Sequence, residues 1–251
     1  MTLARSFFRA ATVAALIACT PQLFADVYEL RTYTAAEGKL DALNARFRDH
    51  TVRLFKRHGI ESLGYWIPTD AEKSKNTLIY VLQHKSRDAA AASWKAFGTD
   101  PEWRAAAKAS GVGRLANPPV SVFMEAADFS PMWKNGSADK NAVFELRTYR
   151  CNPGKLSNLD ARFRDHTIRI FARHGMKSVA YWHPSDEPDS NDTLIYILRH
   201  DSQDAAAASW KSFSGDTEWK KVAAESQKDG RFLRERPGSV YMQATDYSGI
   251  H

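Results

Sequence analysis

The chain repeats most of its sequence once, at a fixed offset of 116 residues. The run ARFRDHT at 45–51 returns unchanged at 161–167, and ELRTY at 29–33 returns at 145–149. Only the end of each copy departs from the offset, because the counterpart of VFM at 122–124 comes two positions late. Solenoid repeats have periods of about 20–50 residues, so a period this long indicates duplication of a whole domain. We therefore expect two copies of one module within the chain.

The first 25 residues have the features of a secretory signal peptide. Arg5 and Arg9 form a basic start, and the apolar run at 10–18 that follows is too short to anchor the chain in a membrane. Cleavage after Ala25 would release an ordinary periplasmic or secreted protein. The lipobox-like sequence that ends at Cys19 would instead give a lipid-anchored one. We favour plain export, with lipidation at Cys19 and mitochondrial import as the alternatives.

Cysteine usage and charge narrow the range of functions. Without the leader, Cys151 is the remaining cysteine, so we expect no intrachain disulfide. Its counterpart in the first copy is Ala35, which argues against a functional thiol. The net charge of +6 comes from interleaved basic and acidic residues, a pattern that argues against nucleic acid as a partner. Beyond the leader, we expect no transmembrane segment.

Each copy predicts the order strand, helix, strand, strand, helix, strand. In the first copy, apolar residues at helical spacing from Leu40 to Leu54 mark one face of a helix, and Gly59 ends that helix. The second helix is rich in alanine and restarts at a Thr-x-x-Glu capping box at 99–102. This order is the split βαβ, or ferredoxin-like, pattern of the α+β class. The strands expected in the first copy are 27–34, 63–67, 77–84 and 120–126.

The repeat also predicts how the two modules are arranged. A ferredoxin-like sheet carries both helices on one face and leaves its other face bare and apolar. Two such faces can cover each other, so we expect an intrachain pseudo-dimer of the dimeric α+β barrel type, closed over a shared interior. A further oligomer is left open. The expected divisions are a signal peptide at 1–25, a first module at 26–127, a linker at 128–141 and a second module at 142–247.

Two histidines in equivalent places are the candidate catalytic residues. His50 lies between Phe47 and Leu54 on the apolar stripe of the first helix, and His166 is its counterpart in the second copy. Facing the sheet, such a histidine could accept a proton or hold a bound group. The alternative is a core histidine that a hydrogen bond satisfies. We find no spacing typical of a zinc site, and no phosphate loop or nucleophile elbow, so we predict no metal.

The first strand of each copy supplies candidate ligand-binding residues. Alternation places Glu29, Arg31 and Tyr33 on one strand face, which we expect to look into the interior between the sheets. Arg31 would then clamp an acidic or oxygenated ligand, although it could instead pair with Glu29. Aromatic residues of the second strand would form flat walls, or simply belong to the core. The candidates are Arg31, Tyr33, Tyr65, Trp66, Arg147, Tyr149, Tyr181 and Trp182.

The chain resembles the NIPSNAP family over almost its whole length beyond the leader. The marks in each copy are ELRTY in the first strand, GKL at 38–40 and 154–156, the helical histidine, the His-Gly pair and Tyr-Trp before a proline. The resemblance implies a dimeric α+β barrel with two ferredoxin-like halves, and it implies no defined reaction. Animal members are linked to vesicle and mitochondrial quality-control roles. A secretory leader departs from that picture.

Three functions remain, in this order. The first is a small-molecule binding protein outside the cytoplasm, with a pocket in each half. The second is a protein-interaction module whose interior is filled by side chains. The third is an enzyme, because cousins of this fold include cofactor-independent monooxygenases and haem-handling proteins. Fold alone does not decide between these functions. We predict no cofactor, and haem is the alternative to that prediction.

Overall fold

The computed structural model describes residues 26–132 and 141–250, and the two halves contain the same series of elements. The first half contains β1 (Val27–Thr34), α1 (Leu40–Arg46), η1 (Phe47–Thr51), α2 (Val52–Arg57), β2 (Glu61–Pro68), η2 (Lys73–Lys75), β3 (Thr77–His84), α3 (Arg87–Thr99), α4 (Pro101–Ala109) and β4 (Val120–Ala126). The second half contains β5 (Val143–Arg150), α5 (Leu156–Arg162), η3 (Phe163–Thr167), α6 (Ile168–Arg173), β6 (Lys177–Pro184), η4 (Asp189–Asn191), β7 (Thr193–His200), α7 (Gln203–Gly215), α8 (Thr217–Ser226) and β8 (Gly238–Ala244). The expected leader at 1–25, with Cys19, lies outside the described residues.

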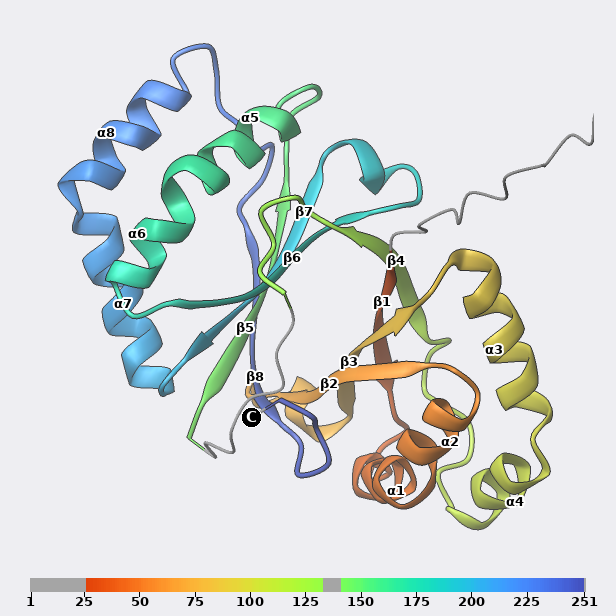
Figure 1. Ribbon diagram of the computed structural model, residues 1–251. Helices are drawn as coiled ribbons and strands as arrows, with labels where there is room; N and C mark the ends of the chain where they lie inside the picture. The colour runs from red at the N-terminus through yellow and green to blue at the C-terminus, as the bar shows by residue number, and fades with distance from the viewer. Residues whose placement is uncertain (1–25, 133–140, 251) are drawn as a thin grey trace, which may run out of the picture.

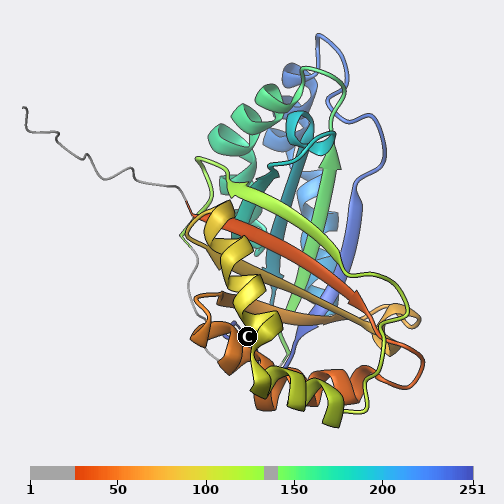
Figure 2. The same ribbon diagram turned by 90° about the vertical axis from the view of Figure 1, so that its right-hand side faces the viewer.

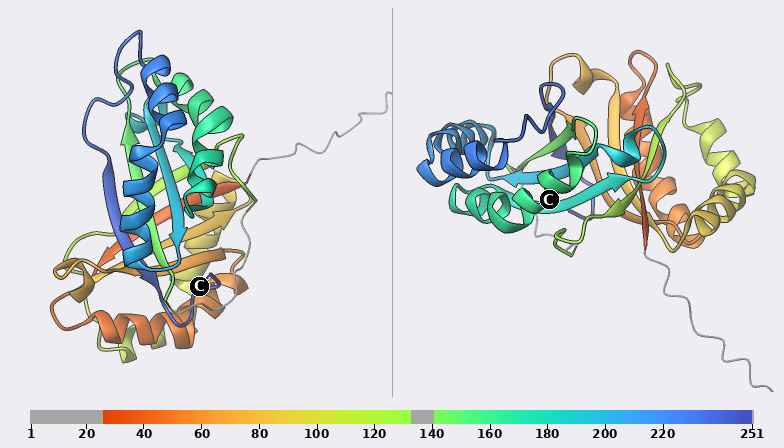
Figure 3. Two further views of the ribbon diagram at one scale, coloured as in Figure 1. Left: turned by 90° about the vertical axis from the view of Figure 1, so that its left-hand side faces the viewer. Right: turned by 90° about the horizontal axis from the view of Figure 1, so that it is seen from above.

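The strands close into one barrel in the order β1-β3-β2-β8-β5-β7-β6-β4. Helices α1 to α4 lie on one outer side of this barrel and α5 to α8 on the opposite side (Figure 1 and Figure 3). Figure 2 shows the strands of the first half running obliquely across those of the second. The predicted α+β class and the intrachain dimeric α+β barrel are confirmed. No helix within the described ranges is long and apolar enough to cross a membrane.

The last strand of each half joins the two halves. Strand β4 pairs with β1 of its own half and with β6 of the other, and β8 pairs likewise with β5 and β2. Both seams are antiparallel, with Glu125 opposite His183 in one and Ile67 opposite Gln243 in the other. Backbone groups that would form exposed sheet edges in an isolated half are therefore paired across the seams.

The segments that follow β4 and β8 also cross to the opposite half. Tyr247 packs beside Phe47 of the first half, and its hydroxyl donates a hydrogen bond to Asn44 Oδ1 at 2.7 Å. The guanidinium of Arg48 donates two hydrogen bonds, of 2.7 and 2.8 Å, to the carboxylate of Asp246. In the other direction Phe129 packs on the second-half core, so the start of the expected linker at 128–141 is a packed segment.

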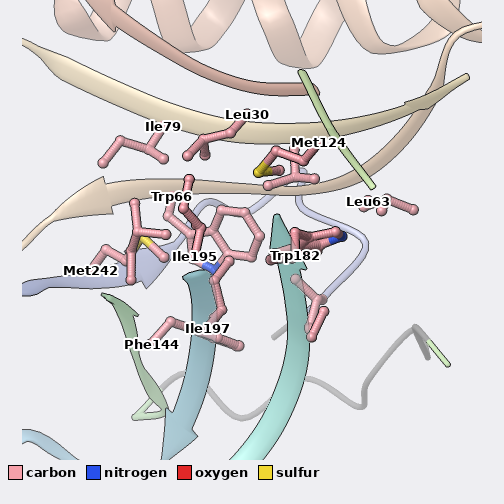
Figure 4. Close-up of a cluster of buried hydrophobic side chains, with 14 of the residues drawn as sticks. Leu30, Leu63, Trp66, Ile79, Met124, Phe144, Trp182, Ile195, Ile197 and Met242 are labelled. Atoms are coloured by element: carbon pink, nitrogen blue, oxygen red, sulfur yellow. The ribbon is translucent and has the colours of Figure 1, made fainter. Parts of the chain in front are cut away.

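The interior between the two sheets is filled by side chains (Figure 4). Trp66 and Trp182 are almost fully buried there, and the Trp66 ring lies 5.7 Å from the ring of Phe144. Aliphatic and methionine side chains fill the rest of this cluster. Tight packing of this kind is typical of a protein core. Trp66 and Trp182 therefore belong to the core, which matches the alternative to aromatic walls of a ligand site.

The faces of the first strand are the reverse of those we expected. Leu30 points into the barrel interior, whereas Glu29, Arg31 and Tyr33 lie on the side that the helices cover. The alternation itself is correct. Which face meets the helices could not be read from it, because each face of the sheet is covered by another layer.

A turn of π-helix interrupts the first helix of each half. The N–H of Val52 bonds to the carbonyl of Phe47, and the N–H of Ile168 bonds to that of Phe163, five residues back in both cases. This wider turn contains one residue more than an α-helical turn, so it shifts which side chain points inward. Thr51 is therefore buried in the position where α-helical spacing placed His50.

Candidate functional site

Beneath the helices of each half lies a buried carboxylate held by four donors. In the second half, Glu145 Oε1 accepts from Arg147 Nη1 at 2.6 Å and from Ser239 Oγ at 2.7 Å. Its Oε2 accepts from Trp210 Nε1 at 2.7 Å and lies 3.2 Å from His200 Nε2. Burial alone would raise the pKa of Glu145, but these partners lower it to about 2.

The first half repeats this network around Glu29, with Arg31, Ser121, Trp94 and His84 as its partners. Arg31 and Arg147 are therefore each neutralised by a glutamate within the fold. The guanidiniums also donate toward Tyr33 and Tyr149, at 3.4 and 3.3 Å. This geometry matches the pairing alternative, and it leaves these two arginines little charge to offer to a ligand.

A pocket of about 550 Å³ opens between the helices and the sheet of the second half. Its lining includes Tyr149 of β5, Phe163 and Thr167 of the π-helical turn, and Trp219 of α8. Six residues of the segment 231–237, which leads into β8, also line the pocket, and we call this segment the rim. Of the candidates named from the sequence, Tyr149 lines this pocket. Tyr181 lies close behind it, fully buried against Phe163.

The distinctive group of this pocket is Arg162, the last residue of α5. Its side chain is 7% exposed, and its guanidinium lies 4.6 Å from the ring of Phe232 and 5.2 Å from that of Trp219. Nη1 donates to Ser226 Oγ at 3.3 Å, and the buried Nε has no hydrogen-bond partner. Among the described residues no carboxylate pairs with this cation. Burial lowers the pKa of Arg162.

Arg46 is the counterpart of Arg162 in the first half, and sequence reasoning overlooked both. Arg46 is 8% exposed, lies 5.0 Å from the ring of Trp103 and has an unpartnered Nε. Burial lowers its pKa as well. A signal was present, because Arg46 is three residues from Leu43 and next to Phe47, on the apolar stripe of the helix. An arginine on that stripe must be buried, and the repeat placed one in each copy.

The candidate histidines do not line this pocket. His166 lines an outer groove of about 530 Å³ between α5, η3 and α8, together with Glu218 and Lys221, and Arg162 lines this groove as well as the helix–sheet pocket. His50 has the equivalent place in the first half and is half-buried. His58 and His174, at the ends of α2 and α6, lie 2.7 and 2.8 Å from the capping carboxylates of Asp100 and Asp216.

The part of the chain that the structure describes contains no cluster of three or more histidine, cysteine, aspartate or glutamate side chains able to hold a metal ion. Of the residue types that ligate haem iron, a tyrosine, Tyr149, lines the helix–sheet pocket, whereas no histidine, cysteine or methionine lines it. Cys151 is a free buried thiol, and burial raises its pKa to about 11, so it is a poor nucleophile. What the pocket can do is surround a flat group with aromatic rings and place an anion on Arg162.

Comparison with known proteins gives a family for both halves. The NIPSNAP family model matches residues 28–131 and again 144–248. The Protein NipSnap homolog of Dictyostelium discoideum is 28% identical over 132 residues, which is 52% of this chain. The match spans 51% of that relative, about half its length.

Two solved structures of low sequence identity share the fold over most of the chain. The chain is similar to a protein from Lactobacillus acidophilus described as a putative monooxygenase, with a TM-score of 0.56 and 12% identity, covering 88% of this chain and 94% of that one. An anthrone oxidase-like protein gives a TM-score of 0.52 at 10% identity, covering 89% and 93%. A NIPSNAP family protein from Agrobacterium tumefaciens is 23% identical over 43% of this chain and 95% of its own, with a TM-score of 0.38.

Proposed function

The chain belongs to the NIPSNAP family as a tandem of two family domains, and on that premise we propose that it binds a small organic acid in the helix–sheet pocket of its second half. The observation that carries this proposal is the buried guanidinium of Arg162, which has no carboxylate partner among the described residues. Isolated charges are costly to bury, so a fold that retains one is suited to receiving the opposite charge.

The aromatic lining indicates what the rest of the ligand resembles. Phe163, Phe171, Phe213 and Trp219 border the pocket, and together they offer ring faces and edges to an apolar body. Aromatic rings attract one another in offset or edge-to-face arrangements. A ligand with a planar or hydrophobic body and a carboxylate or phosphate at one end fits this lining. A pocket of about 550 Å³ is within the ordinary range for small-molecule sites.

The test measures thermal stabilisation of the whole protein by benzoate, phenylacetate and their uncharged amides. A ligand present at a hundred times its Kd stabilises by about 2.7 kcal/mol, which is a rise in Tm of roughly 5–10 °C for a chain of this size. We expect the acids to stabilise the protein and the amides to have little effect. Absence of stabilisation by any aromatic acid at millimolar concentration would contradict the proposal.

The duplication supplies a matched control for this test. Arg162→Gln removes the cation from the second-half pocket, and Arg46→Gln removes the equivalent buried cation from the first half. Both changes relieve the fold of a poorly solvated charge, so their effects on the unliganded protein should be similar. Stabilisation by benzoate should disappear in the first variant and persist in the second. Equal loss in both variants would mean that the effect is not specific to the second-half pocket.

A second candidate function is oxidation of an aromatic substrate in the same pocket. It is suggested by fold neighbours described as a putative monooxygenase and an anthrone oxidase-like protein, whose low identity supports the fold alone. Oxygen uptake with quinol and anthrone substrates tests this candidate. Uptake that Arg162→Gln reduces and Arg46→Gln does not would favour an enzyme over a binding protein. A Soret band after haem addition would favour a haem-handling protein instead.

We also propose that the mature protein acts outside the cytoplasm, after removal of residues 1–25. This proposal is supported only by the sequence of that segment, its basic start and short apolar run. Mass spectrometry of protein from its native host would give the mature N-terminus. A chain beginning at Asp26 supports plain export, a lipid-modified Cys19 supports anchoring, and a chain that retains Met1 contradicts both.

A further inference from the structure

The rim of the second-half pocket is more basic than the equivalent segment of the first half. The segment that enters β8 reads RFLRERP at 231–237, whereas the segment that enters β4 reads GRLANPP at 113–119. The two segments occupy equivalent places, because Ala116 donates its N–H to the Thr34 carbonyl as Arg234 does to that of Arg150. The rim is thus a place where the two copies have diverged in charge.

Two of the charged rim residues are already neutralised within the fold. Arg234 forms an ion pair with Asp192, and Glu235 accepts from Arg150 Nη1 at 3.0 Å. Arg231 and Arg236 remain, and within the described parts of the chain neither has a carboxylate partner. Both are exposed and both line the pocket. With Arg162 inside, three guanidiniums around one cavity lack a carboxylate partner among the described residues.

We propose that the second-half pocket takes a ligand with two anionic groups, one bound inside at Arg162 and one bound at the rim by Arg231 and Arg236. This inference rests on the proposed function, and it names the class of ligand as an aromatic or otherwise apolar dianion. Carboxylate and phosphate both match the fork of donors on a guanidinium, and a phosphate ester or a dicarboxylic acid supplies the required charge. The first half, with Ala116, Asn117 and Pro118 in place of the second-half rim, binds such a ligand more weakly.

The two anion sites differ in their response to salt. Exposed charges are screened over about 8–10 Å at physiological ionic strength, whereas a buried pair is screened much less. Binding at the rim should therefore weaken as salt is added, and binding at Arg162 should weaken less. A dianion should show a steeper salt dependence than a monoanion of the same shape, which separates the rim from the inner site.

The experiment compares benzoate, terephthalate and phenyl phosphate as probes, by titration calorimetry on the whole protein at several salt concentrations. Terephthalate adds a second carboxylate to the benzoate ring, and phenyl phosphate tests whether a single dianionic group suffices. We expect terephthalate to bind about fivefold more tightly than benzoate at low salt, which is the upper range of the effect of one additional exposed ion pair. That advantage should shrink at high salt.

The rim variant Arg231→Gln with Arg236→Gln should reduce the preference for terephthalate over benzoate to about twofold or less. The control variant Lys108→Gln with Arg114→Gln removes the same charge from exposed first-half positions, and it should keep the fivefold preference. Equal affinity of the unmodified protein for benzoate and terephthalate would overturn this inference while the proposed function stands. Failure of both probes to bind would overturn the proposed function itself. A preference that persists in the rim variant would show that the arginines at 231 and 236 are not its source.

Discussion

Each half buries a glutamate that has hydrogen-bond partners for its charge and an arginine that has no carboxylate partner among the described residues. Glu145 has every lone-pair direction used, by an arginine, a tryptophan, a histidine and a serine. Arg162, in contrast, contacts one serine hydroxyl and two aromatic rings, and none of these neutralises its charge. A satisfied buried charge specifies structure, and an unsatisfied one is available for binding. This contrast, rather than burial alone, separates the structural network from the candidate site.

The glutamate networks predict acid sensitivity. Partners lower the pKa of Glu29 and of Glu145 to about 2, from an ordinary value near 4.5. A group with a depressed pKa in the folded state contributes stability above its unfolded pKa and loses it as the pH falls through the folded value. Each glutamate should therefore contribute about 3 kcal/mol at neutral pH, lost between about pH 4.5 and pH 2. Urea unfolding across this range measures the loss.

The variant Glu145→Gln sharpens this prediction. It leaves Arg147 buried without its partner, so unfolding free energy at pH 7 should fall by about 3–5 kcal/mol. The difference from the unmodified protein should become small near pH 2, because the glutamate is then losing its charge as well. Glu29→Gln is the matched variant in the first half and should behave alike. A pH-independent difference would show that packing, and not ionisation, is what the change disturbs.

At the residue scale, the sequence identified several of the right side chains and misplaced some of them. The ion pairs of Arg31 with Glu29 and of Arg147 with Glu145 were among the alternatives that alternation allowed. The partners Trp94 and His84 could not be found, because they are distant in sequence: Trp94 reaches Glu29 from helix α3, and His84 reaches it through the pairing of β3 with β1. A buried arginine without a partner leaves no separate mark in a sequence, beyond its position on an apolar stripe.

At the scale of elements, the π-helical turn decides which side chain faces the sheet. Thr167 is buried, and its Oγ1 donates to the carbonyl of Arg162 at 3.1 Å, five residues earlier. The turn thereby moves His166 to the outer groove and directs Phe163 and Thr167 to the pocket. A pattern with period 3.6 cannot reveal an inserted residue, so the predicted inward orientation of His50 and His166 was wrong for a geometric reason.

This arrangement predicts different outcomes for two adjacent substitutions. Thr167→Ala removes a buried hydroxyl that bonds to the backbone, and it should lower the free energy of unfolding by about 1 kcal/mol. His166→Ala changes a side chain on the outer groove and should shift stability by no more than about 0.5 kcal/mol. Chemical denaturation measures both. A loss of several kcal/mol on removing the imidazole would mean that it takes part in the core after all.

Strand boundaries were predictable, and strand orientation was not. Three of the four strands expected in the first half begin and end as the structure has them, while β2 is longer than its apolar centre. Both faces of each sheet are covered, one by helices and one by the opposite sheet, so large side chains occupy both faces. The polarity of the residues therefore does not indicate which face of a strand meets the helices and which meets the opposite sheet. Glu29 and Arg31 lie under the helices, where Trp94 and His84 form hydrogen bonds with the carboxylate of Glu29.

At the scale of the whole molecule, duplication was the feature that predicted the architecture. A module with one bare apolar sheet face needs a second sheet to cover that face. The chain contains two such modules, so the repeat predicts the closed barrel. The exchange of the segments after β4 and β8 was not predictable, because the sequence assigned residues 128–141 to a polar linker and residues 142–247 to the second module. Their aromatic residues Phe129 and Tyr247 were the available signal, and the ion pairs Arg164–Asp128 and Arg48–Asp246 hold the exchanged segments in place.

The closed barrel predicts that the two halves unfold together. Strands β4 and β8 each belong to both halves, and the interior cluster around Trp66 and Trp182 is shared. Scanning calorimetry of the whole protein should therefore show one transition whose calorimetric and van't Hoff enthalpies agree. Trp182→Ala should cost about 3–5 kcal/mol and move that single transition to lower temperature without splitting it. Two transitions, with only one displaced by the substitution, would mean that the halves are stable separately and that the seams contribute little.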